Sequence, residues 1–469
     1  MKAYKIMLFV AITIAMLAAI CLFFPQEGVQ VAGVGVRFPT LLRILNPQKQ
    51  LDIEAYLARQ DSLEAVLQSR KDSLEHFRKE VAESDIRFWL PNDDETFFDA
   101  LFAEMEGACT SGRTIRVMHY GDSQIEMDRM TNRLRSYMQG QFGGGGAGFV
   151  PFATIISSLG ISISGTGSLV HQSPFGDSTV VRAGGNYGPM VQDFRVAGSA
   201  QCRLHGATSR LCDERLQHFS RLTLIFNNRP GPLSASCSAG AFSEQQECEE
   251  EGVHAFAWKL DSVVAGATIS VTGTADLYGV MVDAGPGVAV DNIPMRGCSG
   301  HQFTQINADQ LAAAYSFMDV GLIILQFGGN SVPYLKGEQS IASYCKQIGI
   351  QIDRLHSCCP KAKILFVGPS DMSTSENGEL VSYACLPKVV EMLRQTANAH
   401  GAAFWSIYHA MGGHNTMAAW VNEGLAGSDY IHFTQRGADI MGDRLAKAFD
   451  NMYQLYKMRK GVSSEYNEL

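Results

Sequence analysis

Three residues in this sequence have the types and spacing needed for attack on a carbonyl carbon: a serine within Gly-Asp-Ser, and an aspartate and a histidine three residues apart near the C-terminus. Ser123 offers a hydroxyl, which becomes a good nucleophile when a neighbouring base takes its proton. His432 can act as that base. Asp429, in the same loop, can accept a hydrogen bond from the imidazole and support the imidazolium that forms during attack. We therefore predict a catalytic triad of Ser123, His432 and Asp429.

Two further motifs offer donors for the negative charge that develops on the carbonyl oxygen. Gly297 lies in the turn Arg-Gly-Cys-Ser-Gly, where no side chain obstructs its backbone N–H. Asn330 ends the sequence Phe-Gly-Gly-Asn after an apolar run, and its amide can donate to an oxyanion. Together with the backbone N–H of Ser123 they form the predicted oxyanion hole. Plain turn geometry at Gly297 and a helix N-cap at Asn330 are the alternative interpretations.

The segments around these motifs alternate between strand and helix. Apolar strands are expected at residues 115–120, 320–327 and 364–367, and amphipathic helices at residues 94–106, 127–139, 341–355 and 386–400. Ser123 follows the first strand directly, which places it at the carboxyl end of a parallel strand, where open α/β sheets build their sites. The predicted fold class is α/β with a parallel sheet.

The stretch between residue 143 and about residue 290 has a different character, rich in glycine, serine and threonine. Short runs typical of strands lie at residues 222–226, 255–260, 268–272 and 278–282, separated by turn-forming residues. Regularly spaced short strands of this kind favour a β-sandwich. We interpret the stretch as an insertion that splits one α/β domain.

The order of the motifs, Gly-Asp-Ser, a glycine turn, Gly-x-Asn and Asp-x-x-His, resembles the SGNH (GDSL-type) hydrolase superfamily. The resemblance covers residues 115–143 and 291–449. It implies the three-layer SGNH fold, and it assigns Ser123 as nucleophile and Gly297 and Asn330 as oxyanion donors, with the Asp-x-x-His pair completing the triad.

Two positions depart from the family pattern: Ser331 stands where a second acid is usual, and Gln124 stands where leucine is usual. The first puts the local geometry around Asn330 in doubt. The large β insertion, the glycine-rich run at residues 142–149 and residues 288–293 are similar to the peptidoglycan O-acetylesterases and related O-acetyltransferases. In those proteins the insert resembles a carbohydrate-binding module.

The N-terminus carries a topological signal. Lys2 and Lys5 precede an uninterrupted apolar run at residues 6–24, which is about the length that spans a bilayer. Lysines before the run place the N-terminus in the cytoplasm and the remainder outside. We favour an uncleaved anchor, and a cleaved signal peptide is the alternative. The charged helical pattern at residues 51–83 predicts a stalk, and its thin apolar stripe leaves self-association and the oligomeric state open.

Six segments follow from these patterns: an anchor at 1–25, a linker and helical stalk at 26–90, the first part of the SGNH domain at 91–150, the β-sandwich insertion at 151–287, the second part of the SGNH domain at 288–455, and a tail at 456–469.

Net charge and cysteine content limit the kinds of partner, cross-link and metal site that the sequence predicts. The net charge of -9 over 469 residues, with scattered basic residues, argues against a nucleic-acid partner. The sequence contains eleven cysteines, which in an exported chain suggests pairing, with Cys237 to Cys248 or Cys202 to Cys212 as candidates. No cysteine and histidine grouping has zinc-like spacing, so neither a metal nor a cofactor is expected.

The sequence therefore predicts a membrane-anchored serine esterase with its catalytic domain outside the cytoplasm, in the periplasm or at the cell surface. The predicted reaction is removal of O-acetyl groups from an envelope or extracellular polysaccharide, such as peptidoglycan. A polysaccharide O-acetyltransferase with the same triad is the first alternative. A catalytically silent glycan-binding envelope protein is the alternative from a different class.

Overall fold

The computed structural model describes residues 3–25, 27–31, 34–40, 44, 53–176 and 180–466. The chain divides into two compact units: residues 74–460, and residues 1–73 together with 461–469. The smaller unit contains helix α1 (Ala3–Phe23), the antiparallel pair β1 (Val29–Val31) and β2 (Val34–Val36), and the beginning of helix α3 (Ile53–Glu83).

Helix α1 coincides with the predicted anchor. Among the described residues it is the one helix long and apolar enough to cross a membrane, with a mean hydropathy of 2.9. Helix α3 forms where the charged helical pattern predicted it, although residues 51 and 52 of that prediction lie outside the described residues. Its function as a stalk stays a prediction.

The larger unit is built on a five-stranded sheet in which every neighbouring pair is parallel. In spatial order its strands are β12 (Gly287–Pro294), β3 (Thr114–Gly121), β13 (Val320–Gln326), β14 (Lys363–Gly368) and β17 (Ala403–Ser406). Both faces of this sheet are covered, which is why its strands read as almost continuous apolar runs. The predicted α/β fold class is confirmed.

Alternate residues of these strands enter two separate cores. Val117 and Leu365 pack in one core with helices α4 (Asp99–Ser111), α5 (Thr131–Phe142) and α11 (Gln435–Tyr466). Met118 and Phe366 pack in the other, with helices α6 (Ala308–Tyr315), α7 (Glu338–Cys358) and α8 (Leu386–Ala399). The result is a three-layer arrangement, completed by the short helices α9 (Ile407–Met411) and α10 (Met417–Asn422).

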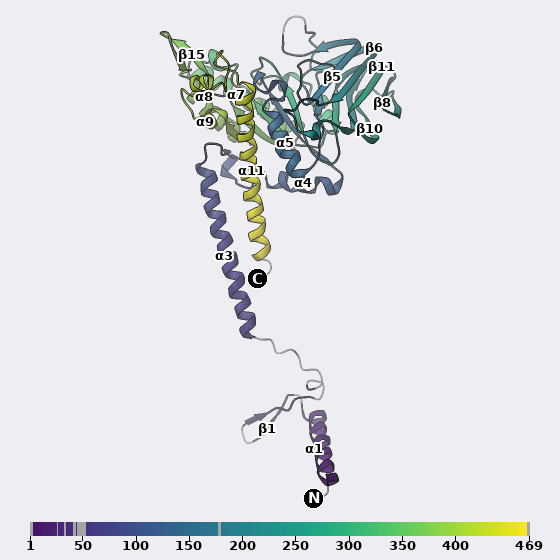
Figure 1. The fold of residues 1–469 in the computed structure, drawn as a ribbon, viewed down its shortest axis with the longest axis vertical. Helices are drawn as coiled ribbons and strands as arrows, with labels where there is room; N and C mark the ends of the chain where they lie inside the picture. The colour runs from purple at the N-terminus through teal and green to yellow at the C-terminus, as the bar shows by residue number, and fades with distance from the viewer. Residues whose placement is uncertain are drawn as a thin grey trace. The chain divides into compact units, whose positions relative to one another are not determined.

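An antiparallel sheet of eight strands lies between β3 and β12 in the sequence and confirms the predicted β insertion. Its strands are β4 (Gly148–Val150), β5 (Ile161–Gln172), β6 (Asp193–Gly206), β7 (Phe219–Asn228), β8 (Leu233–Ala239), β9 (Phe242–Cys248), β10 (Gly252–Val264) and β11 (Gly266–Asp283). In Figure 1 these teal strands gather at one side of the larger unit, away from α7, α8 and α9.

The runs at residues 268–272 and 278–282 belong to one strand, whereas the sequence predicted two. Strand β11 continues through both because its pairing with β6 is unbroken from Gly266 to Leu277, so the intervening residues form no turn. It also pairs with β8 along its first half and with β7 and β4 along its second half. This one long strand thereby joins all eight strands into a single hydrogen-bonded sheet.

A buried ionic cluster connects the two sheets. Arg116 on β3 is 2% exposed and contacts Asp291 on β12 through two nitrogens, at 2.7 and 3.2 Å. Its third contact is with Asp283, the last residue of β11, at 2.9 Å. Asp291 also accepts a hydrogen bond from the backbone N–H of Phe149 on β4 at 2.7 Å. The guanidinium of Arg116 therefore connects the end of the insert to the five-stranded parallel sheet.

Neither candidate disulfide forms. The eleven cysteines, all within the described ranges, are free thiols. In the register of β8 with β9, Cys237 lies opposite Glu244 instead of Cys248. Cys202 is buried in β6, and the thiol of Cys212 donates to a backbone carbonyl oxygen in the loop before β5. Register and burial, which residue spacing does not reveal, keep both pairs apart.

Candidate active site

Three parallel strands end at the same level, and this alignment assembles the site. In the sheet register, Gly121 at the end of β3 lies beside Pro294 of β12 and Gln326 of β13. The motifs that follow these three strands therefore emerge along one edge. Helix α5, which follows β3, packs on one face of the sheet, whereas α7, which follows β13, packs on the other. A crevice between two such strands is the usual position of a site in open α/β sheets.

Ser123, His432 and Asp429 form a continuous chain of hydrogen bonds. The Oγ atom of Ser123 lies 2.7 Å from Nε2 of His432, and Nδ1 of His432 lies 2.7 Å from Oδ2 of Asp429. Oδ1 of Asp429 accepts hydrogen bonds from the backbone N–H groups of Ile431 and His432, both at 3.0 Å. This geometry permits proton transfer from the hydroxyl to the imidazole, with the carboxylate fixing the orientation of the ring.

The carboxylate of Asp429 is suited to remain ionised. Partial burial acts to raise the pKa of Asp429, but hydrogen bonds from the ring and backbone of His432 and from Ile431 hold that pKa below its usual value. An ionised partner favours the imidazolium that forms when Ser123 attacks.

Asn330, which follows the end of β13, lies next to the segment that carries Ser123. Its Nδ2 atom donates to Oδ2 of Asp122 at 3.3 Å and to the carbonyl oxygen of Cys298 at 3.1 Å. Both amide hydrogens are thus engaged, so donation to an oxyanion requires one of these contacts to be exchanged. Ser331, the residue that departs from the family pattern, is buried behind it.

Gly297 lies in an exposed turn and has a φ of 74°, in the left-handed region that glycine adopts without strain. Apart from its two chain neighbours, no described residue has an atom within 4 Å of where its Cβ would stand. Gly297 is not among the residues that line the cavity described next. The structure therefore brings Ser123, Asn330, His432 and Asp429 together and leaves Gly297 at the edge of the site.

An open cavity of about 170 Å³ lies over Ser123. Its lining is mostly apolar and includes the polar side chains of Ser123, Asn330 and His432. Its lining residues are Asp122, Ser123, Gln124, Gln326, Phe327, Gly329, Asn330, Pro333, Tyr334, Gly368, Pro369, Ser370, Met372, Ile407, Ile431 and His432.

Asp122 directly precedes Ser123 and is 5% exposed. Burial raises the pKa of Asp122 to about 6, while the N–H of Gln124 and the nearby His432 act in the opposite direction. Because this folded-state pKa lies above the usual 3.8, the contribution of Asp122 to the free energy of unfolding is complete below about pH 4 and is lost as the pH rises through about 6.

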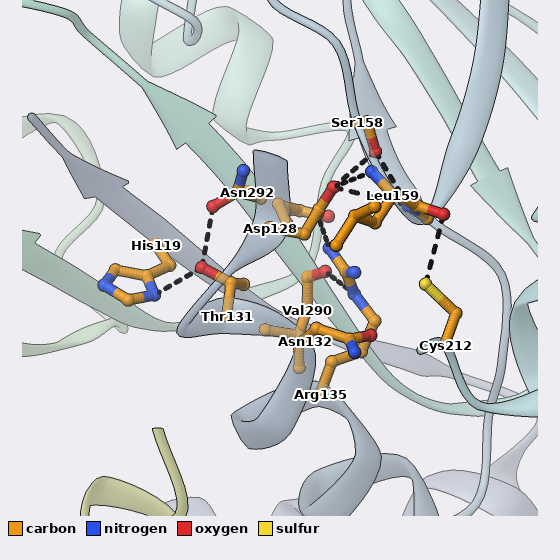
Figure 2. Close-up of polar contacts among 12 residues, drawn as sticks. His119, Asp128, Thr131, Asn132, Arg135, Ser158, Leu159, Cys212, Val290 and Asn292 are labelled. Carbon is orange, nitrogen blue, oxygen red and sulfur yellow. Dashed lines mark hydrogen bonds and ion pairs between the residues drawn. The ribbon is translucent and has the colours of Figure 1, made fainter. Parts of the chain in front are cut away.

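The segment that carries Ser123 is anchored at its far end by a buried polar network (Figure 2). Met127 and Asp128 both have positive φ values, 59° and 58°, which delay the start of α5 to Thr131 instead of the predicted residue 127. The carboxylate of Asp128 contacts Arg135, at 3.0 Å, and the hydroxyl of Ser158, and these contacts offset the cost of the uncommon backbone conformation. Arg135 in turn donates to the carbonyl oxygen of Val290 on β12 at 2.7 Å.

Sequence reasoning missed two residues that join the nucleophile segment to the histidine loop. The side chain of Gln124 bonds the backbone on both sides of His432, and that of Arg129 bonds the carbonyl oxygens of Ser123 and Phe433. Their partners in the histidine loop lie more than 300 positions away in the sequence, so no local pattern marks these contacts. The only available signal was the departure from leucine at Gln124.

Comparison with known proteins agrees with this fold. Residues 261–440 match the model of the GDSL-like Lipase/Acylhydrolase family. The range begins within β10 of the insert and does not include Ser123. In this match and in its three-layer fold, the α/β domain is similar to the SGNH (GDSL-type) hydrolases.

One solved structure shares nearly the whole architecture. It is described as a peptidoglycan O-acetylesterase and has a TM-score of 0.62 and 19% sequence identity, over 79% of this chain and 99% of the other. A family two carbohydrate esterase from Clostridium thermocellum matches with 8% identity and a TM-score of 0.26, over 56% of this chain and 95% of the other. No curated protein matches the chain.

Proposed function

We propose that this protein removes O-acetyl groups from a polysaccharide of the cell envelope or its surroundings, through an acyl-serine intermediate. The observation that carries the proposal is the 2.7 Å contact of Ser123 with His432, continued at 2.7 Å to Asp429, with Ser123 and His432 lining an open cavity. The fold shared with a peptidoglycan O-acetylesterase supports acetylated glycans as the substrate class.

The proposed reaction has two halves. Oγ of Ser123 attacks the acetyl carbonyl carbon while Nε2 of His432 takes the hydroxyl proton, and the negative charge moves to the carbonyl oxygen. The tetrahedral intermediate then expels the sugar oxygen, which receives the proton from Nε2, and acetyl-Ser123 remains. Water attacks that ester by the same route, with His432 again as base, and acetate leaves.

The assay that tests this function is acetate release by the detergent-solubilised full chain. Acetylated peptidoglycan and other acetylated glycans are offered with and without a sugar acceptor. Release of acetate that the acceptor does not diminish supports hydrolysis. Transfer of acetyl groups to the acceptor in preference to water establishes the acetyltransferase alternative, and binding without turnover establishes the silent glycan-binding alternative.

We further propose that α1 anchors the chain in a membrane with the catalytic domain outside the cytoplasm, on the basis of its apolar length and the lysines before the apolar run. Protease added outside the inner membrane is expected to digest the catalytic domain in cells. Recovery of the full-length chain in the soluble cytoplasmic fraction excludes this location.

Asn330→Ala is expected to lower kcat about 10²- to 10³-fold with little change in KM, because the donor acts on charge that exists only in the transition state. Steady-state kinetics on a small acetyl ester measure this. Asn398→Ala is a matched control, since the Asn398 amide also donates two hydrogen bonds, in this case both to backbone carbonyl oxygens, but lies outside the cavity. If both variants lose only thermal stability, Asn330 is a structural residue.

Tyr334 is expected to hold a sugar ring at the cavity. Its side chain is 78% exposed although it lines the cavity, while its neighbours Val332 and Leu335 are buried and fix the turn. Tyr334→Ala is expected to raise KM for the polymer about three- to tenfold and to leave turnover of a small ester unchanged, since stacking on the substrate is uniform binding. Tyr334→Phe, which keeps the ring, is expected to retain the KM, and an equal loss on both substrates contradicts this function.

A further inference from the structure

The histidine loop is exposed, which raises the question of what holds His432 in line with Ser123. The side chains of Asp429 and His432 are 49% and 38% exposed. The loop belongs to neither a long helix nor the parallel sheet. Backbone hydrogen bonds such as Gly427 N–H to the carbonyl oxygen of His432, at 2.8 Å, close it on itself, and the N–H of Ser373 donates to the carbonyl oxygen of Tyr430 at 3.2 Å. A loop of this kind needs contacts from the nucleophile side to keep the imidazole within reach of the hydroxyl.

Gln124 supplies two such contacts. Its Nε2 atom donates to the carbonyl oxygen of Ile431 at 2.7 Å, and its Oε1 atom accepts from the N–H of Phe433 at 3.2 Å. One side-chain amide thus bonds the residue before His432 and the residue after it. Gln124 is 8% exposed, so water competes little for these bonds, and its own N–H is fixed by Oδ1 of Asp122 at 3.0 Å.

Arg129 completes the connection from the same segment. One of its terminal nitrogens donates to the carbonyl oxygen of Phe433 at 2.9 Å, and the other donates to the carbonyl oxygen of Ser123. Its Nε atom donates to the carbonyl oxygen of Glu126 at 3.0 Å, which fixes the guanidinium on its own segment. Both backbone polar groups of Phe433 are therefore bonded to residues that follow the nucleophile.

We propose that Gln124 and Arg129 form a clasp that positions His432 as the base for Ser123. Gln124 lines the cavity, but in this proposal both residues act through the backbone beside His432 and are positioning residues. Gln124 is the principal member because it bonds the backbone on both sides of the imidazole. The proposal rests on the proposed function of the Ser123, His432 and Asp429 site.

Gln124→Leu tests the clasp because leucine keeps a similar size and removes both hydrogen bonds. A displacement of the base by about 1 Å costs on the order of 10²-fold in rate, so kcat for a small acetyl ester is expected to fall about 10- to 100-fold with KM within twofold of wild type. The rate at which an organophosphonate labels Ser123 is expected to fall in parallel, because labelling needs the same activated hydroxyl.

Gln351→Leu is the matched control. Gln351 is 1% exposed and also makes two hydrogen bonds, to the N–H and the hydroxyl of Thr304, but it lies on α7 outside the cavity. This variant is expected to lower the melting temperature without lowering kcat. Gln124→Glu is the second variant: it keeps the acceptor for Phe433 and loses the donor to Ile431, and it is expected to remain folded with a reduced kcat.

Two outcomes overturn the proposal. One is a Gln124→Leu enzyme that keeps its kcat within twofold of wild type. The other is a loss of kcat in Gln351→Leu equal to that in Gln124→Leu. Failure of the proposed function gives a different result. In that case the Ser123→Ala and His432→Ala enzymes retain their activity on the acetyl ester, independently of the result for the Gln124 variants.

Discussion

Ser123→Ala is expected to lower kcat for acetyl-ester hydrolysis by about four to six orders of magnitude while leaving the fold intact. The hydroxyl is the atom that forms the acyl-enzyme, and without it only substrate binding and the oxyanion donors remain to assist direct attack by water. The side chain is half-buried and its loss removes one hydrogen bond, to His432, so a large change in melting temperature is not expected. Steady-state kinetics and a thermal melt measure the two quantities.

The control for this variant is Ser357→Ala, which removes an exposed hydroxyl on α7 and is expected to keep full activity. An organophosphonate followed by peptide mapping identifies the nucleophile directly. Labelling of any serine other than Ser123 contradicts the assignment, as does substantial turnover by the Ser123→Ala enzyme.

Arg116→Met is expected to destabilise the protein by about 3–5 kcal/mol, the cost of breaking a buried ion pair by removing one partner. The guanidinium contacts Asp283 and Asp291, which are buried too, so the variant leaves two carboxylates without their counter-ion in the interior. Chemical denaturation monitored by circular dichroism gives the free energy of unfolding. The expected loss is a large part of the stability of a typical domain.

Arg133→Met is the comparison for this experiment. The Arg133 guanidinium also contacts a carboxylate, that of Asp443 at 2.6 Å, but the two side chains are 43% and 52% exposed. Solvent-exposed pairs typically contribute 0–1 kcal/mol, so the variant is expected to lose less than about 1 kcal/mol. An Arg116→Met protein no less stable than Arg133→Met shows that the buried cluster does not hold the sheets together.

Much of the α/β fold could be predicted because its parallel strands are buried on both faces. Residues 364–367 are apolar without interruption, and residues 115–120 are apolar except for Arg116 and His119; the structure places the two runs in β14 and β3. The sequence did not predict that residues 268–272 and 278–282 belong to one strand, because Gly273 between them is a typical turn residue. In the structure Gly273 pairs with Gly198 of β6, which keeps β11 continuous. The disulfide prediction failed for a similar reason: the register of β8 with β9 places Cys237 opposite Glu244, and residue spacing does not reveal strand register.

The candidate triad was accessible from sequence because its chemistry demands particular residue types: few alternatives to Ser123 and to the Asp429 and His432 pair offer a nucleophile and a base with its partner. The supporting residues were not accessible. Gln124 and Arg129 bond backbone groups, and a backbone group carries no signature in the sequence, so only the folded chain reveals these contacts.

The pairing of β3 with β12 has a consequence for how the chain folds. These strands are neighbours in the parallel sheet, yet the entire antiparallel sheet separates them in sequence. Bringing together the ends of so long a segment costs chain entropy, and contacts between distant segments form slowly. Strand β4, near the start of the insert, pairs with the end of β11, so the folded insert already holds its own two ends together. Once the insert has folded, β3 and β12 are joined by a short effective loop. We therefore expect the pairing of β3 with β12 in the parallel sheet to be a late folding step that depends on the insert having folded first.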